Sequence, residues 1–303
     1  SGAGNPPNPN GLKTDYLWKS VLTRDSLANI IESFAQVVEE ETDSKGKKRK
    51  KRKQIFPRFH QLRTVRALLR CARADGVGKR YLIQHSAGSG KSNTIAWLAH
   101  QLVELRTATD PLTAQFDSII VITDRRALDT QIARTIKGYD HVASIFGHSD
   151  NAQELREYLR RGKKIIVTTV QKFPFILDEL GDLSGKKFAL LIDEAHSSQG
   201  GKTTARMHEA LGGVTEENFE EDSTQDAVNS EIEKRIQSRK LLSNASYFAF
   251  TATPKNKTLE LFGEKIIVGD KVQFRSPEEF IYTTKQAIQE KFILDVVANY
   301  TSY

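Results

Sequence analysis

The motif in this chain with the clearest chemistry is a glycine-rich segment that contains a lysine. Residues 85–92 read HSAGSGKS, with the apolar run YLIQ before them and a helical pattern after them. Glycines let such a loop fold tightly, so that backbone N–H groups and the positive end of the next helix face phosphate oxygens. We expect Lys91 to face the β and γ phosphates of a nucleotide and Ser92 to ligate Mg²⁺. The residues expected to bind the nucleotide here are Gly88, Ser89, Gly90, Lys91 and Ser92. The full pattern G-x-x-x-x-G-K-[ST] has a glycine where this chain has His85.

An acidic motif follows another apolar run, FALLID at 188–193. A carboxylate at the end of a buried strand is costly unless it meets a cation, and Mg²⁺ with an attacking water would remove that cost. Asp193 is then expected to hold the metal, directly or through water, and Glu194 to orient and deprotonate the water. The alternative is a turn that ends the strand and caps the following helix.

A third motif, FTATP, follows the run YFAF. The hydroxyls of Thr251 and Thr253 can hydrogen-bond near the γ phosphate or to His196. Taken alone this motif is weak, because strands often end in Thr-Pro turns.

The elements that carry these motifs alternate along the chain. Apolar, β-branched runs predict strands at 81–84, 118–123, 164–170, 188–193 and 247–251, with helical patterns near 91–106, 125–136, 151–161, 171–180 and 203–211. Strands that are apolar on both faces and separated by helices predict an α/β fold, a mostly parallel sheet covered on both sides. Ligands bind at the carboxyl ends of such strands, which is where all three motifs lie.

Two further helices are expected before this region. One, at about 25–38, has apolar residues three and four apart, namely Leu27, Ile30, Ile31, Phe34, Val37 and Val38. The other, at 59–73, ends near Cys71, which is expected to be inert packing. The first 15 residues are rich in Pro, Gly and Asn and are typical of a linker.

The net charge of +7 does not by itself indicate a nucleic-acid partner. Eight Lys or Arg residues lie between Lys45 and Lys53, and eight carboxylates lie between Thr215 and Glu233. We interpret both segments as solvated loops, the basic one as a mobile connector with a phosphate-contacting arm as the alternative. DNA or RNA binding must therefore be argued from motifs.

Composition excludes several classes of protein. With 38% hydrophobic and 27% charged residues the chain is neither wholly disordered nor a coiled-coil rod. One cysteine excludes a disulfide scaffold and fits a reducing compartment. No apolar stretch is long enough to span a membrane and the start does not resemble a signal peptide, so we expect a cytoplasmic location without a membrane partner.

In this order AGSGKS, DEAH and TATP resemble motifs I, II and III of superfamily 2 helicases and translocases. The strings FPRFHQ, DRRALDTQI, TTVQKF, DEAHSSQ and FTATP, with YLWKSVLTRDSL and QAIQEKFILDVVANY at the ends, resemble the motor (R) subunit of type I restriction enzymes. This resemblance covers nearly the whole chain.

The resemblance implies an ATP-dependent double-stranded DNA translocase with a RecA-like P-loop NTPase domain, using ATP and Mg²⁺ beside modification and specificity subunits. It implies that Gln61 contacts the adenine edge and that Phe59 stacks on the base. The residues implied to follow the DNA backbone are Arg125, Arg126, Thr169, Gln171 and Lys172.

The resemblance also implies a division of the chain. Residues 1–54 would be a helical linker with the basic run, 55–268 the first motor domain, and 269–303 a connection toward a second motor domain. Neither a nuclease domain nor the arginine-rich motif VI is recognisable in the chain. Two other functions stay open: another superfamily 2 motor such as a DEAH-type RNA helicase, and an ATP-binding fragment without turnover of its own.

Overall fold

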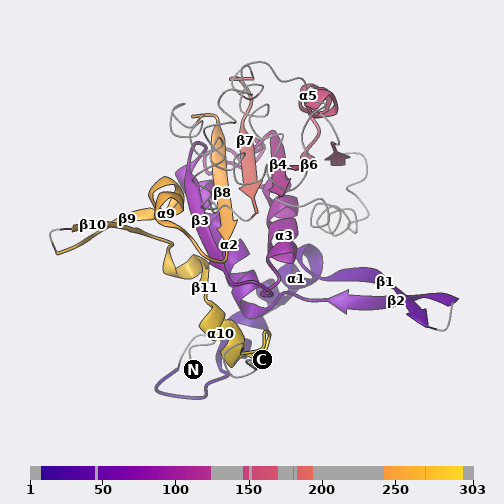
Figure 1. Cartoon of the computed structure of the whole chain (residues 1–303), viewed down its shortest axis with the longest axis vertical. Helices are drawn as coiled ribbons and strands as arrows, with labels where there is room; N and C mark the ends of the chain where they lie inside the picture. The colour runs from indigo at the N-terminus through magenta and orange to yellow at the C-terminus, as the bar shows by residue number, and fades with distance from the viewer. Residues whose placement is uncertain are drawn as a thin grey trace, which may run out of the picture.

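The computed structural model describes residues 8–44, 47–123, 146–149, 152–169, 180, 183–193, 242–269 and 271–295 (Figure 1). Its centre is a seven-stranded sheet in the order β11-β3-β8-β7-β4-β6-β5. The strands in chain order are β3 (Arg80–His85), β4 (Ser118–Thr123), β5 (Phe146–His148), β6 (Ile165–Thr169), β7 (Phe188–Ile192), β8 (Ala245–Thr251) and β11 (Ile281–Tyr282). Every neighbouring pair is parallel, so the carboxyl ends of all seven strands lie along one edge.

Helices cover both faces of this sheet. Alternate residues of the central strands enter two separate apolar clusters, for example Ile83 and Val121 in one and Leu82 and Ile122 in the other. Helices α2 (Phe59–Asp75) and α3 (Lys91–Glu104) contribute to the first cluster, and α5 (Ala152–Arg160) and α9 (Asn256–Phe262) to the second. The expected α/β class with a covered parallel sheet is confirmed.

The five expected strands are all present as β3, β4, β6, β7 and β8, and the expected helices at 59–73, 91–106 and 151–161 correspond to α2, α3 and α5. Runs that are apolar on both faces locate central strands well, because such strands are buried from end to end. The short strands β5 and β11 were not expected. The expected helices near 125–136, 171–180 and 203–211 lie outside the described residues, apart from residue 180.

The expected helix over 25–38 is too long. Helix α1 covers Arg24–Ser33, and Val37 and Val38 lie in the next element, strand β1 (Gln36–Ser44). Phe34 is fully buried, but the side chain of Ile31 is 60% exposed. A helix and a strand that follow each other closely mimic one long apolar pattern, and the β-branched valines favour the strand.

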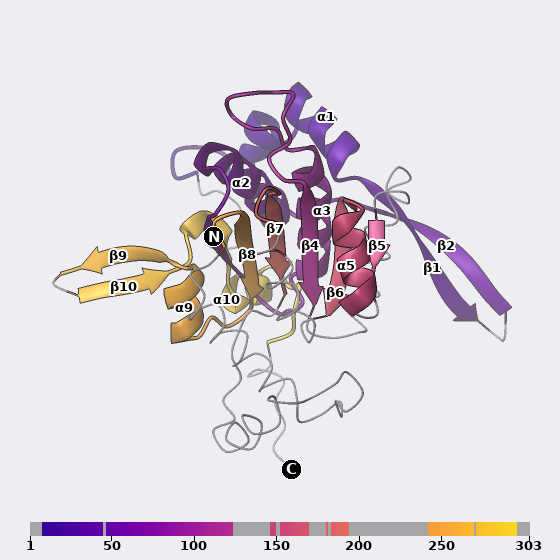
Figure 2. The ribbon, with the colours of Figure 1, turned by 90° about the horizontal axis from the view of Figure 1, so that it is seen from above.

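The expectation that the basic run is a loop is wrong for residues 47–53. They belong to strand β2 (Lys47–Ile55), which pairs antiparallel with β1 in a hairpin that extends away from the sheet (Figures 1 and 2). In this register, residues of opposite charge stand at directly opposed positions, an arrangement that favours antiparallel pairing. The opposed pairs are Glu39↔Arg52, Glu40↔Lys51, Glu41↔Lys50 and Asp43↔Lys48.

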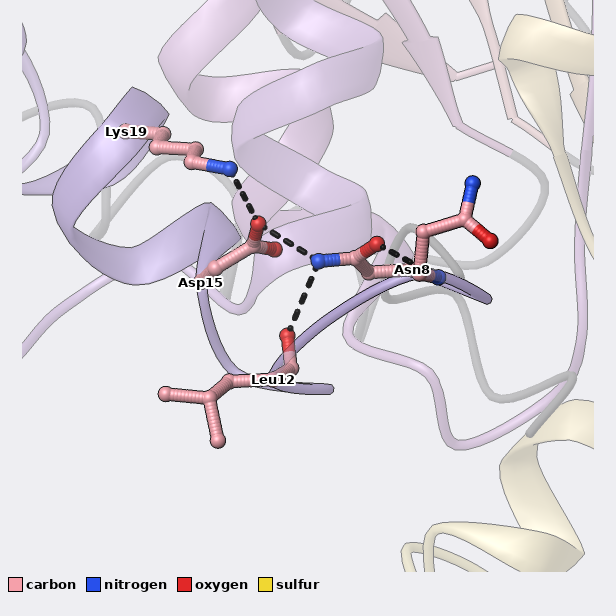
Figure 3. A network of polar contacts seen from close by, with 5 residues as sticks. Asn8, Leu12, Asp15 and Lys19 are labelled. Atoms are coloured by element: carbon pink, nitrogen blue, oxygen red, sulfur yellow. Dashed lines mark hydrogen bonds and ion pairs between the residues drawn. The ribbon is translucent and has the colours of Figure 1, made fainter.

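The chain before α1 is ordered by its own polar contacts. Asn8 Nδ2 donates to the Leu12 carbonyl at 3.3 Å and to Asp15 Oδ2 at 2.7 Å, and Lys19 Nζ binds the same carboxylate oxygen at 2.6 Å (Figure 3). Helix η1 (Leu17–Val21), a short π-helix, and then α1 follow. Arg66 of α2 holds α1 in place by donating to Asn29 Oδ1 at 2.8 Å. The leading segment therefore packs on helix α2.

The last described part of the chain leaves the sheet and then returns to it. Strands β9 (Glu264–Val268) and β10 (Lys271–Arg275) form a second projecting hairpin, on the side opposite the first (Figure 2). After it, η3 (Glu278–Phe280) leads into β11, which pairs with β3, and α10 (Thr284–Gln289) follows. Continuation toward a second motor domain stays a prediction, but residues 276–282 lie against the sheet.

Candidate functional site

The glycine-rich loop lies between β3 and α3, as the sequence predicted. Gly88 and Gly90 have φ values of +72° and +86°, in the left-handed region that residues with a Cβ rarely adopt. The loop closes on itself where Ser89 N donates to the Ser86 carbonyl at 3.2 Å. Within the described part of the chain no side chain caps the first turn of α3, which begins at Lys91. The amino end of a helix in this geometry suits an anion.

The loop also contains buried hydroxyl groups. The Ser86 and Ser89 side chains are 1% and 0% exposed, and neither Oγ has a hydrogen-bond partner among the described residues. Buried polar groups are normally hydrogen-bonded, so a ligand rich in oxygen atoms would complete this loop. The loop therefore fits a phosphate group.

Helix α2 holds the end of the loop through Gln61, which is 3% exposed. Gln61 Nε2 donates to the Gly90 carbonyl at 3.0 Å, and Gln61 Oε1 accepts from the Arg58 amide at 2.8 Å. A Cβ on Gly90 would lie 2.6 Å from Gln61 Nε2, so this position requires glycine. Both ends of the Gln61 amide are thus used within the protein, and its contact with adenine stays a prediction.

Phe59, the residue expected to stack on the base, is half-buried. Its ring packs edge-on against Tyr16 from the leading segment, with centroids 5.1 Å apart and planes at 66°. Arg58, beside it, places its guanidinium 3.6 Å above the centre of the Phe292 ring. Residues from both ends of the described chain therefore meet at the start of α2.

Sequence reasoning missed three aromatic residues behind the loop. The rings of His60 and Tyr282 are stacked, with centroids 3.7 Å apart and planes at 6°, and His85 packs edge-on against His60 at 5.3 Å. His60 Nε2 donates to the Ser89 carbonyl at 3.2 Å. The only signal in the sequence was His85 itself, which occupies a glycine position of the usual pattern.

Both histidines are neutral at neutral pH. Burial, assisted by Arg58 and opposed by the bond to the Ser89 carbonyl, lowers the pKa of His60 to about 4. Burial, with His60 and Lys91 nearby, lowers the pKa of the fully buried His85 well below its usual value. His85 Nε2 lies 3.2 Å from the hydroxyl of Thr64, which donates to the Glu279 carbonyl at 3.3 Å.

The other expected residues lie along the same edge of the sheet. Lys91 is 9% exposed, and Ser92 follows it in the first turn of α3. Asp193, 4% exposed, comes directly after β7, and its amide donates to the Ile122 carbonyl at 2.9 Å. Because β8 lies between β3 and β7, Thr251 at its end lies between the loop and Asp193. Thr251 Oγ1 accepts from the Thr253 amide at 3.2 Å.

Several predicted site residues fall outside the described part of the chain. Of the residues expected to contact DNA only Thr169 is described; it ends β6, is 8% exposed and lies opposite Thr123 of β4. The predicted residues that lie outside it are Arg125, Arg126, Gln171, Lys172, Glu194 and His196. The structure therefore brings together the motif I residues with Asp193 and Thr251.

Comparison with a family model identifies the domain. The model described as SWI2/SNF2 ATPase matches residues 60–301, which include all three motifs. The chain belongs to the SWI2/SNF2 ATPase family. Membership means an ATPase motor domain, and the parallel sheet with its glycine-rich loop after β3 is the expected RecA-like α/β fold. Among the described residues no helix is long and apolar enough to cross a membrane.

Curated relatives of this SWI2/SNF2 ATPase confirm the resemblance to restriction enzymes. The type I restriction enzyme HindI endonuclease subunit of Haemophilus influenzae is 26% identical over 245 residues, 76% of this chain and 20% of that protein. The type I restriction enzyme SsaAORF53P endonuclease subunit of Staphylococcus saprophyticus is 26% identical over 202 residues, 65% of this chain and 17% of that protein. The chain spans between 15% and 61% of the length of the curated relatives it matches.

Among solved structures, the SWI2/SNF2 domain is similar to helicases. The UvsW helicase from bacteriophage T4 is 15% identical with a TM-score of 0.39, covering 80% of this chain and 66% of that one. The Hef helicase domain of Pyrococcus furiosus is 16% identical with a TM-score of 0.39, covering 68% and 35%.

Proposed function

We propose that this chain binds ATP with Mg²⁺ in the loop between β3 and α3 and couples ATP hydrolysis to movement along double-stranded DNA, as the motor part of a type I restriction endonuclease subunit. The observation that carries the nucleotide site is the loop itself. It combines two glycines at positive φ, a buried lysine at the start of α3 and two buried serine hydroxyls without partners among the described residues. A phosphate would satisfy all of these groups at once.

The chain's own residues then divide the work. Lys91 binds the β and γ phosphates, and Ser92 and Asp193 hold the metal from two elements that meet at one edge of the sheet. Mg²⁺ bound there would neutralise charge on the phosphate oxygens. Glu194 is proposed to accept a proton from the attacking water. Thr251, which lies between the loop and Asp193, is proposed to respond to the γ phosphate together with Thr253 and His196.

DNA contact is proposed along the same sheet edge, through Thr169 and, outside the described residues, Arg125, Arg126, Gln171 and Lys172. Since β4 pairs with β7 and β6 pairs with β4 in the same sheet, one lobe can link the state of the phosphate to the grip on the polymer. The names of the relatives support type I restriction as the context. Modification and specificity subunits as partners, and a cytoplasmic location, are part of this proposal.

ATP hydrolysis measured with and without nucleic acid tests the proposal. We expect duplex DNA of any sequence to stimulate hydrolysis, and Glu194→Gln to lower the rate while ATP still binds, because only the proton acceptor is removed. Stimulation by RNA and not by DNA would favour the RNA helicase alternative. Binding of ATP with no turnover under either condition would favour the alternative of a fragment without turnover of its own.

A further inference from the structure

We propose that His60 and Tyr282 are positioning residues that hold the peptide between Ser89 and Gly90 so that the Gly90 N–H faces the phosphate. Neither ring is placed against the nucleotide, and Tyr282 acts through His60. The inference rests on the proposed nucleotide site and deepens it, because it says what holds the shape of the loop.

The first step is the geometry of one peptide bond. In a trans peptide the C=O and the next N–H point in opposite directions. His60 Nε2 donates to the Ser89 carbonyl at 3.2 Å, so that carbonyl is directed toward α2. The Gly90 N–H must therefore point the other way. A loop with glycines at 88 and 90 has little intrinsic barrier to rotation of this peptide, so an external hydrogen bond decides its direction.

The second step is that His60 is a dependable donor. Its ring is 5% exposed and, with a pKa of about 4, neutral at neutral pH. A neutral imidazole has one N–H, and a carbonyl acceptor requires that N–H to be at Nε2. The charged group that acts on the ring is Arg58, and a guanidinium has no acceptor atom, so it cannot accept this hydrogen bond in place of the Ser89 carbonyl.

The third step is that Tyr282 fixes the plane of the His60 ring. The two rings lie parallel at 3.7 Å, and His85 contacts His60 edge-on, so the ring is held between two aromatic neighbours. Tyr282 is itself held by several contacts: it is fully buried, pairs with His85 through β11 and β3, and donates its hydroxyl to Glu290. Its carbonyl also accepts from the Ser86 amide at 2.9 Å, which holds the start of the loop.

Removing the His60 N–H or the Tyr282 ring should therefore weaken the binding of the nucleotide's phosphate groups and leave the binding of its base unchanged. His60→Phe keeps a ring against Tyr282 and removes the N–H. Tyr282→Leu keeps an apolar side chain and the backbone carbonyl but removes the stack. Tyr282→Phe keeps the stack and removes only the hydroxyl contact with Glu290.

The experiment is calorimetric titration of the full chain with MgADP and with AMP, which lacks the β phosphate. We expect His60→Phe and Tyr282→Leu each to weaken MgADP by about tenfold, the effect of one lost buried hydrogen bond, and to change AMP far less. Tyr282→Phe should restore nearly normal binding. The double variant His60→Phe with Tyr282→Leu should be no weaker than His60→Phe alone, because Tyr282 acts through His60.

Tyr247→Leu is the matched control. Tyr247 is a buried tyrosine of β8 whose ring packs near Phe262, in the cluster on the sheet face opposite α2, so its loss should leave the ratio of MgADP to AMP affinity unchanged. If the unaltered chain does not bind MgADP, the proposed function fails. If it binds and both variants keep the unaltered ratio, or lose MgADP and AMP equally, the positioning role is overturned and the nucleotide site stands. If Tyr282→Leu does not fold, the ratio of MgADP to AMP affinity in His60→Phe alone tests the positioning role.

Discussion

The side-chain amide of Gln61 donates a hydrogen bond to the carbonyl oxygen of Gly90 over 3.0 Å, and so joins the first turn of α2 to the residue before α3. The approach is so close that any side chain at position 90 would collide with the amide. The loop therefore takes its shape from helix α2 as well as from its own glycines. The start of α2, which is implied to select adenine, and the glycine-rich loop, which is expected to bind phosphate, are therefore joined by a direct hydrogen bond.

Replacing Lys91 with alanine should remove most of the affinity for ATP. Lys91 is 9% exposed at the start of α3, and a buried charge-assisted contact contributes about 1.5–3 kcal/mol, so a loss of about 100-fold is expected. Titration of a fluorescent ATP analogue with Mg²⁺ measures it. Lys79→Ala, an exposed lysine before the amino end of β3, is the control. Equal affinity for the unaltered chain and Lys91→Ala would place the phosphate site elsewhere.

Gln61→Ala should weaken ATP more than GTP, by about 1 to 3 kcal/mol if the lost hydrogen bonds are buried. The structure adds that thermal stability should fall too, because the Arg58 amide and the Gly90 carbonyl lose their partner. Binding of both nucleotides and the melting temperature are measured together. Gln101→Ala, which removes one side-chain bond from α3, is the control. An unchanged ratio of ATP to GTP affinity with a lower melting temperature would leave Gln61 a structural role only.

Stability should fall as the pH is lowered from 7 to 5. The pKa of His60 is about 4 in the folded chain, below its usual 6.5, so the unfolded chain binds this proton more readily. The contribution of neutral His60 to the free energy of unfolding is complete above pH 6.5 and decreases as the pH falls toward 4. The decrease is about 2 kcal/mol between pH 7 and 5. Urea unfolding at several pH values measures it. His60→Phe should show a correspondingly smaller pH dependence, and an identical dependence in both proteins would contradict the assignment.

DNA binding should be weak, independent of sequence and strongly dependent on salt. Counterion release gives a slope of about −0.9 per neutralised phosphate, and one motor lobe offers few contacts. The double variant Arg125→Ala, Arg126→Ala should reduce both affinity and slope for two unrelated duplexes. The control variant Arg160→Ala with Arg161→Ala changes an exposed pair at the end of α5, near the amino end of β6, and should reduce neither. If the first pair can be removed without effect, the basic strand β2 becomes the better candidate.

The central strands and the loop could be predicted from the sequence because their signals are local. Runs such as 118–123 are apolar on both faces, and the spacing of Gly88, Gly90 and Lys91 is itself the motif. The β1 and β2 hairpin could not be predicted, because β1 pairs with a basic segment that, taken alone, is typical of a separate loop.

The stack of His60 on Tyr282 was equally out of reach of the sequence. It joins residues more than two hundred positions apart, and neither residue type predicts contact with the other. The one signal in the sequence for this cluster was His85, which occupies a glycine position of the usual phosphate-loop pattern. The structure shows the His85 side chain fully buried, with its ring in contact with the rings of His60, Phe250 and Tyr282.

The pairing of β11 with β3 also sets the order of events during synthesis. β3 leaves the ribosome early, but the strand that completes its outer edge, with the ring that stacks on His60, is made last. Such a long-range contact folds slowly, and chains emerge at about 5–20 residues per second, so the loop stays incomplete for on the order of ten seconds or more. Until then the nascent chain carries the glycines and the lysine without their support, and it should not capture nucleotide before the whole domain has been made.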